Sequence, residues 1–65
     1  MVLYGMIKIE ELLQECGQPL TASEIACELD RLISGVEIDL HRLMQQGRVV
    51  QAEFGSYQIS KKGNN

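Results

Sequence analysis

The segment from Gly17 to Glu24 constrains the fold more than any other part of this sequence, because it ends one helix and begins another. Gly17 stands where the residue after a helix often adopts a positive φ. Pro19 blocks continuation of that helix because it has no backbone N–H. Thr21 and Glu24 have the spacing of a capping box, in which each side chain bonds to the other residue's backbone N–H. One helix must therefore end before this segment and a second must begin within it.

Apolar residues at helical spacing predict a helix over residues 6–16 and a second over residues 22–31. The apolar stripe of the first is Ile9, Leu12, Leu13 and Cys16. The buried stripe of the second is Ile25, Leu29 and Leu32, with Ala22 and Ala26 small enough for close packing and Cys27 packed between helices.

A third helix is predicted over residues 35–46. Ser34 and Glu37 repeat the capping spacing, and Gly47 closes the helix as Gly17 closes the first. The inward residues of this helix are Val36, Leu40, Leu43 and Met44. A tight turn around residues 31–33, filled by Ile33, would join the second and third helices as a helix-turn-helix.

Residues 48–60 predict a β-hairpin, since two β-prone runs flank the glycine-containing turn at Phe54, Gly55 and Ser56. Residues 1–5 form an N-terminal extension and residues 61–65 a frayed tail. A chain of 65 residues makes one domain. The predicted fold is therefore mainly α with a small antiparallel hairpin (α+β), built on a three-helix core.

This order of elements resembles the winged helix-turn-helix superfamily, in the small bacterial regulator type. The residues that carry the resemblance are Leu20-Thr21-Ala22-Ser23-Glu24-Ile25-Ala26, Leu29, Val36, Leu40, Leu43 and Gln46-Gly47-Arg48-Val49-Val50. The match spans roughly residues 6–60 and consists of caps and core positions, so it indicates a fold more than a function. The chain is loosely similar to FeoC-like winged helices, but residues 47–60 lack the cysteine cluster of their wing. The resemblance therefore implies no iron–sulfur role.

Cys16 and Cys27 are expected to be reduced, and no cofactor is expected. His41 is the only histidine and no Cys-x-x-Cys pair occurs, so ligands for a zinc site are lacking. No segment approaches the ~20 apolar residues of a membrane span, and the N-terminus lacks the features of a signal peptide. We therefore expect a cytoplasmic protein. No tuned acid–base or nucleophilic constellation is recognisable, so the chain is not expected to be an enzyme.

In winged helices that bind DNA, the third helix commonly enters the major groove. Helical spacing turns four residues of the predicted third helix outward, namely Ile38, His41, Arg42 and Gln45. Arginine and glutamine can read base edges, and isoleucine can meet a thymine methyl. Arg48, Lys61 and Lys62 could neutralise phosphates around the wing. The first hypothesis is therefore a DNA-binding module that acts in transcription regulation on double-stranded DNA, with a homodimer to strengthen binding.

The charge distribution keeps a second hypothesis open. Residues 1–39 hold eight acidic against two basic side chains, and Glu37 and Asp39 are expected to flank the outward face. Carboxylates there would repel phosphate. The alternative is a protein–protein interaction module, an accessory subunit or adaptor that does not touch DNA. Its interface would be an apolar patch of Ile38, Val2, Leu3, Tyr4 and Phe54.

Overall fold

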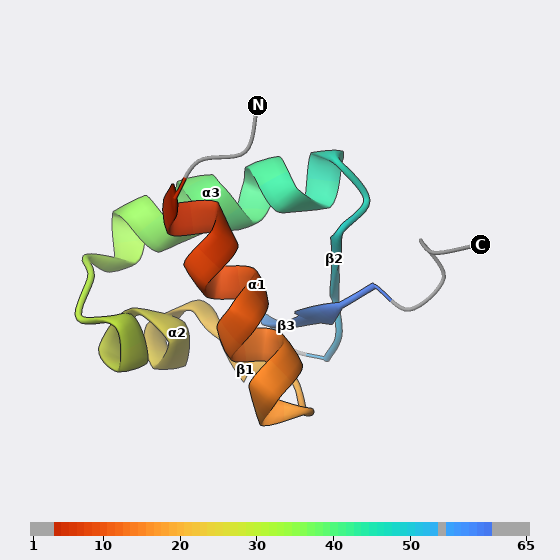
Figure 1. Cartoon of the computed structure of the whole chain (residues 1–65), viewed down its shortest axis with the longest axis horizontal. Helices are drawn as coiled ribbons and strands as arrows, with labels where there is room; N and C mark the ends of the chain where they lie inside the picture. The colour runs from red at the N-terminus through yellow and green to blue at the C-terminus, as the bar shows by residue number, and fades with distance from the viewer. Residues whose placement is uncertain (1–3, 54, 61–65) are drawn as a thin grey trace.

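A computed structural model describes residues 4–53 and 55–60 of the chain. Three helices pack around one core, and a hairpin at the C-terminal end completes a small antiparallel sheet (Figure 1). The elements in order are α1 (Tyr4–Cys16), β1 (Leu20–Thr21), α2 (Ala22–Leu29), α3 (Ile33–Gln45), β2 (Val49–Gln51) and β3 (Ser56–Ile59). The predicted α+β class is confirmed, and the topology is consistent with a winged helix.

The sheet has the order β1-β3-β2, and both pairings are antiparallel. Leu20 of β1 lies opposite Tyr57 of β3, while Val49 of β2 lies opposite Ile59. β1 therefore ties the start of α2 to the hairpin. The hairpin follows α3 in the chain and packs against the helices, with β2 contacting α3 and β3 contacting α1 (Figure 1).

The core draws on all three helices and on β2. Its buried residues are Met6, Ile9, Leu13, Ala22, Ile25, Ala26, Val36, Leu40, Leu43 and Val49. Six further apolar residues pack partly against it: Leu12, Leu20, Leu29, Met44, Tyr57 and Ile59. The predicted stripes of the three helices are thus largely confirmed, because the helical spacing of their apolar residues fixes which side faces inward.

The predicted cap and stops around α1 and α2 are present. Thr21 Oγ1 accepts a hydrogen bond from the Glu24 N–H at 3.1 Å, and Glu24 Oε1 accepts from the Thr21 N–H at 2.9 Å. Gly17 and Gly47 both have positive φ, at 74° and 76°. These two glycines end α1 and α3 where the sequence predicted.

The turn between α2 and α3 differs from the prediction. α2 ends at Leu29 rather than at residue 31, because Asp30 adopts the left-handed conformation and the Arg31 N–H donates to the Ala26 carbonyl. α3 begins at Ile33 rather than at residue 35, with extended Leu32 as its N-cap and no side-chain capping bond. The capping role predicted for Ser34 is therefore wrong, since Ser34 already lies inside the helix.

Other boundaries and burial predictions also require correction. α1 begins at Tyr4, inside the segment predicted as an N-terminal extension. Cys16 and Cys27 are exposed free thiols, so neither acts as a core residue. Leu32 was predicted to be buried and Ile33 to fill the turn, but these residues are 80% and 45% exposed. The early end of α2 places both outside the packed stripe.

Candidate nucleic-acid interface

The outward face of α3 gathers the four side chains that the sequence singled out on this helix. Ile38, His41, Arg42 and Gln45 are all exposed, and with Ser34 and Glu37 they line one shallow depression along the helix. The opposite side of α3 buries Val36, Leu40 and Leu43 in the core. The outward orientation predicted for these four residues is therefore confirmed, while their role stays a prediction.

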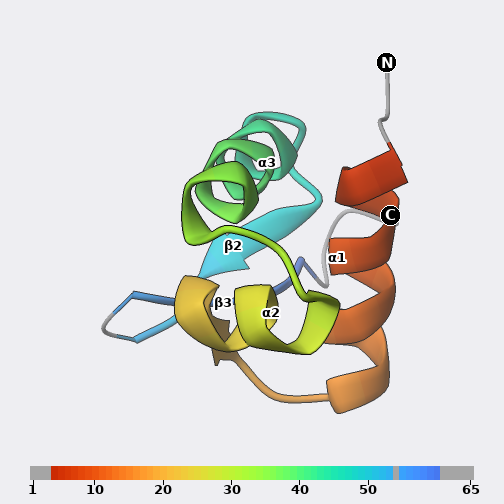
Figure 2. The same ribbon diagram turned by 90° about the vertical axis from the view of Figure 1, so that its left-hand side faces the viewer.

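The position of α3 leaves this face uncovered by the other described elements. α3 runs along one side of the domain, with α1, α2 and the sheet packed against its inner side (Figure 1). The hairpin of β2 and β3 extends away from α1, on the side where α3 also lies (Figure 2). A long, rod-shaped ligand could therefore approach α3 without displacing a helix.

The charges around this face are largely compensated. Within residues 4–53 and 55–60, every basic side chain lies in an ion pair. These pairs are Lys8–Glu11, Arg31–Asp39, Arg42–Asp39 and Arg48–Glu10. The same residues include nine acidic against four basic side chains, so this part of the surface is acidic overall. Long-range attraction of phosphates is consequently weak.

Arg48, the described member of the three cations predicted to contact phosphates around the hairpin, does not line the depression on the α3 face. Arg48 Nε donates a hydrogen bond to Glu10 Oε2 at 2.8 Å, and Arg48 lines a separate depression beside α1. Lys61 and Lys62 lie outside the described residues. Of the cations proposed to contact DNA, Arg42 is the one that the described structure places on the outward face of α3.

Asp39 was expected to flank this face, but it points inward. Its side chain is 9% exposed, and Oδ2 lies 2.8 Å from Arg31 Nη2. Asp39 follows the same spacing as the core residues of α3, three residues after Val36 and four before Leu43. That spacing could have placed Asp39 inward, and the pairing with Arg31 is the feature that sequence reasoning missed. Glu37, by contrast, does line the outward depression.

The apolar patch of the alternative hypothesis is only partly described. Val2, Leu3 and Phe54 lie outside the described residues. Tyr4 is 75% exposed, but it lines a different depression from Ile38, and its ring lies 5.8 Å from the Lys8 ammonium group. The structure therefore does not join Tyr4 and Ile38 into one patch.

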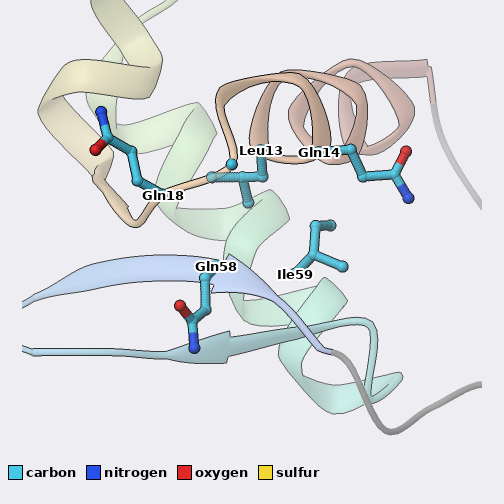
Figure 3. A pocket seen from close by; sticks show the side chains of 6 residues that line it. Leu13, Gln14, Gln18, Gln58 and Ile59 are labelled. Atoms are coloured by element: carbon cyan, nitrogen blue, oxygen red, sulfur yellow. The ribbon is translucent and has the colours of Figure 1, made fainter.

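A second pocket, of about 270 Å³, lies between the C-terminal end of α1 and β3 (Figure 3). Leu13 and Ile59 supply its apolar surface, and Gln14, Gln18 and Gln58 its polar groups. The three amides point in different directions rather than toward one centre (Figure 3). This lining contains no titratable or nucleophilic side chain, so it offers no acid–base chemistry.

Residues 4–53 and 55–60 contain no cluster of three or more His, Cys, Asp or Glu side chains placed to hold a metal ion. None of the described helices combines the length and apolar character that crossing a membrane requires.

Comparison with known proteins assigns no family to this chain. No protein-family model, curated protein or solved structure matches it. The functional interpretation therefore depends on the residues of this chain alone.

Proposed function

We propose that this domain binds double-stranded DNA through the outward face of α3, as a small regulatory module of winged-helix type. The observation that supports this proposal most is the grouping of three hydrogen-bonding side chains and one aliphatic side chain on an uncovered helix face. A helix of this kind fits the major groove, where its outward residues meet base edges.

The chemistry of the four side chains suits base recognition. Arg42 can donate two hydrogen bonds to a guanine, and Gln45 can form a bidentate pair with an adenine. Ile38, 55% exposed at the centre of the face, can contact a thymine methyl. His41, which lines the same depression, adds a further hydrogen-bonding group.

The ion pairs predict modest affinity. If Arg42 on the α3 face and Lys61 and Lys62 in the sequence after β3 all contact DNA, about three phosphates would be neutralised and the slope of log K against log salt would be about −3. Such a domain binds tightly only as a dimer or beside a partner. Affinity for unrelated sequences should accordingly be very low at physiological salt.

The proposal is tested by titrating labelled protein with a mixed-sequence duplex of about 20 bp, at low and then moderate salt, while recording NMR shifts. We expect shifts confined to α3 and the hairpin that reverse as salt rises. Arg42→Ala should cost about 1–3 kcal/mol of discrimination in a selection from random duplexes. Lys8→Ala is the matched control: it also removes a cation, but from the outer side of α1, and should leave this discrimination unchanged. Unshifted resonances at low salt would refute DNA binding by this domain.

A second candidate function, binding to a protein, is favoured by one specific observation. Leu32, Ile33 and Ile38 expose large apolar side chains on an acidic domain, and such groups often mark partner surfaces. On this alternative, Ile38→Asp abolishes self-association or partner binding without unfolding the domain, while Arg42→Ala leaves it intact. Sedimentation of both variants beside the wild type measures whether each change abolishes association. Loss of association in Ile38→Asp alone would favour the protein-binding function, because the DNA-binding proposal requires Arg42.

A further inference from the structure

The Asp39 carboxylate lies where α1, α3 and the turn after α2 meet. Arg31 Nη2 donates a hydrogen bond to Asp39 Oδ2 at 2.8 Å, and Arg31 Nη1 donates to the Gly5 carbonyl at 3.5 Å. Arg42 Nη1 lies 3.7 Å from the other carboxylate oxygen, Asp39 Oδ1. One buried carboxylate thus holds two arginines, one from the turn and one from the outward side of its own helix.

The two arginines are held unequally. Arg31 is bound at hydrogen-bonding distance and its side chain is 29% exposed, whereas Arg42 makes a longer ion pair and is 49% exposed. If Arg42 turned away, Asp39 would keep its shorter bond to Arg31. Breaking most buried ion pairs is costly because it leaves one buried charge without a partner. Release of Arg42 avoids this cost, since the Asp39 carboxylate stays paired with Arg31.

Arg48 provides the contrast. Its partner Glu10 has a side chain only 17% exposed, and Arg48 is the one cation within 4.0 Å of Glu10 among the described residues. Moving Arg48 to a phosphate would leave Glu10 partly buried and unpaired. Arg42 is therefore the arginine that this structure holds in a defined place and can still release.

We infer that Asp39 is a positioning residue for Arg42. It restrains the guanidinium at the margin of the α3 face in the unbound protein, and it releases the group to a base edge while Arg31 keeps the carboxylate paired. This inference rests on the proposed DNA-binding function. Its physical benefit is that a long side chain already restrained before binding loses less conformational freedom when it binds.

The first test needs no DNA. The ¹⁵N–¹H NOE of each arginine Nε is measured in the unbound protein, and the same residues in the urea-unfolded chain give the unrestrained value. We expect Arg42 to be restrained in the wild type and mobile in Asp39→Asn, with Arg48 unchanged. The inference would be overturned if the Arg42 Nε were as mobile in the folded wild type as in urea. This outcome does not depend on whether Asp39→Asn folds.

The second test separates positioning from charge. Wild type, Asp39→Asn and Glu28→Gln are each used to select from a random pool of duplexes, and their affinities for the unselected pool are measured. Both variants remove one negative charge from the domain, so neither should bind the unselected pool more weakly than the wild type does. Asp39→Asn alone should lose about two- to tenfold in preference for selected sequences. Glu28 is exposed on α2, does not line the α3 depression and pairs with neither arginine, so it serves as the matched control.

The outcomes of the two tests are distinguishable. If the wild type binds no duplex, the proposed function fails, while the NOE still decides whether Asp39 restrains Arg42. If Asp39→Asn keeps full sequence preference, the positioning role is refuted although DNA binding stands. A loss of preference and of affinity for the unselected pool together would indicate a damaged fold, and it would also contradict the inference.

Discussion

Gly5 lies where α1 passes closest to the Arg31–Asp39 ion pair, and its substitution by alanine should weaken the domain. An added Cβ would lie 2.7 Å from Asp39 Oδ2 and 3.0 Å from Arg31 Nη1. Real Cβ atoms almost never approach another heavy atom to 2.7 Å, so the carboxylate must move. The Asp39 side chain is short and its oxygen is bound to Arg31 at 2.8 Å, which leaves it little room to move without losing that bond.

The magnitude follows from two opposing effects. Forcing an extra methyl group into a packed site costs about 1–3 kcal/mol. Alanine in place of a helical glycine recovers up to about 1 kcal/mol in a helix interior, and less at the second residue of α1. We expect a net loss of about 1–2 kcal/mol, equivalent to a fall in Tm of roughly 4–16 °C for a domain of this size.

Urea unfolding followed by circular dichroism measures this loss. Gly35→Ala is the matched control, because Gly35 is also in the first turn of its helix and its added Cβ would lie 3.3 Å from the same arginine, at Nη2. That contact is looser, so the control should lose no more than about 0.5 kcal/mol. Equal losses in the two variants, or a stabilised Gly5→Ala, would refute the assignment of strain to the Asp39 carboxylate.

Three further predictions concern the caps, the apolar residues and the thiols. Thr21→Ala should cost about 1 kcal/mol in urea unfolding because it removes a helix cap, whereas Ser34→Ala, inside α3, should change little; similar losses would contradict the assigned start of α3. Leu43→Ala should cost about 2–5 kcal/mol and Leu32→Ala under about 0.5 kcal/mol in the same assay, since the first is buried and the second is 80% exposed. The Cys27 thiol should react with a thiol reagent in the folded protein at nearly the rate seen in urea; strong protection would place it in the core.

The sequence predicted the parts of the fold that local chemistry determines. Gly17 and Gly47 end helices because few other residues adopt a positive φ without strain, and that preference can be read from two positions alone. The capping box of Thr21 and Glu24 likewise involves only two residues that are three positions apart in the sequence. The outward face of α3 was predictable for the same reason, since it is the complement of a regular apolar stripe.

The errors arose where distant residues decide the outcome. Ser34 has the spacing of a cap, but α3 begins earlier because the left-handed Asp30 turns the chain before Ile33. Asp39 has core spacing yet carries a charge, so its inward position makes sense only once Arg31 is placed beside it. Cys27 is an exception, because it lies on the side of α2 opposite Ile25 and Leu29, so helical spacing alone already indicated its exposure. The start of α3 and the pairing of Asp39 with Arg31 depend on the packing of other elements, which no local pattern contains.

The two-residue strand β1 has a consequence for how the domain folds. β2 and β3 are neighbours along the chain and can pair early, but Leu20 meets Tyr57 only after α2 and α3 have been enclosed in the intervening loop. Closing a long loop costs chain entropy before the contact can offset it. We therefore expect the pairing of β1 with β3 to form last and to open first, so that hydrogen exchange at this seam reports the earliest loosening of the whole domain.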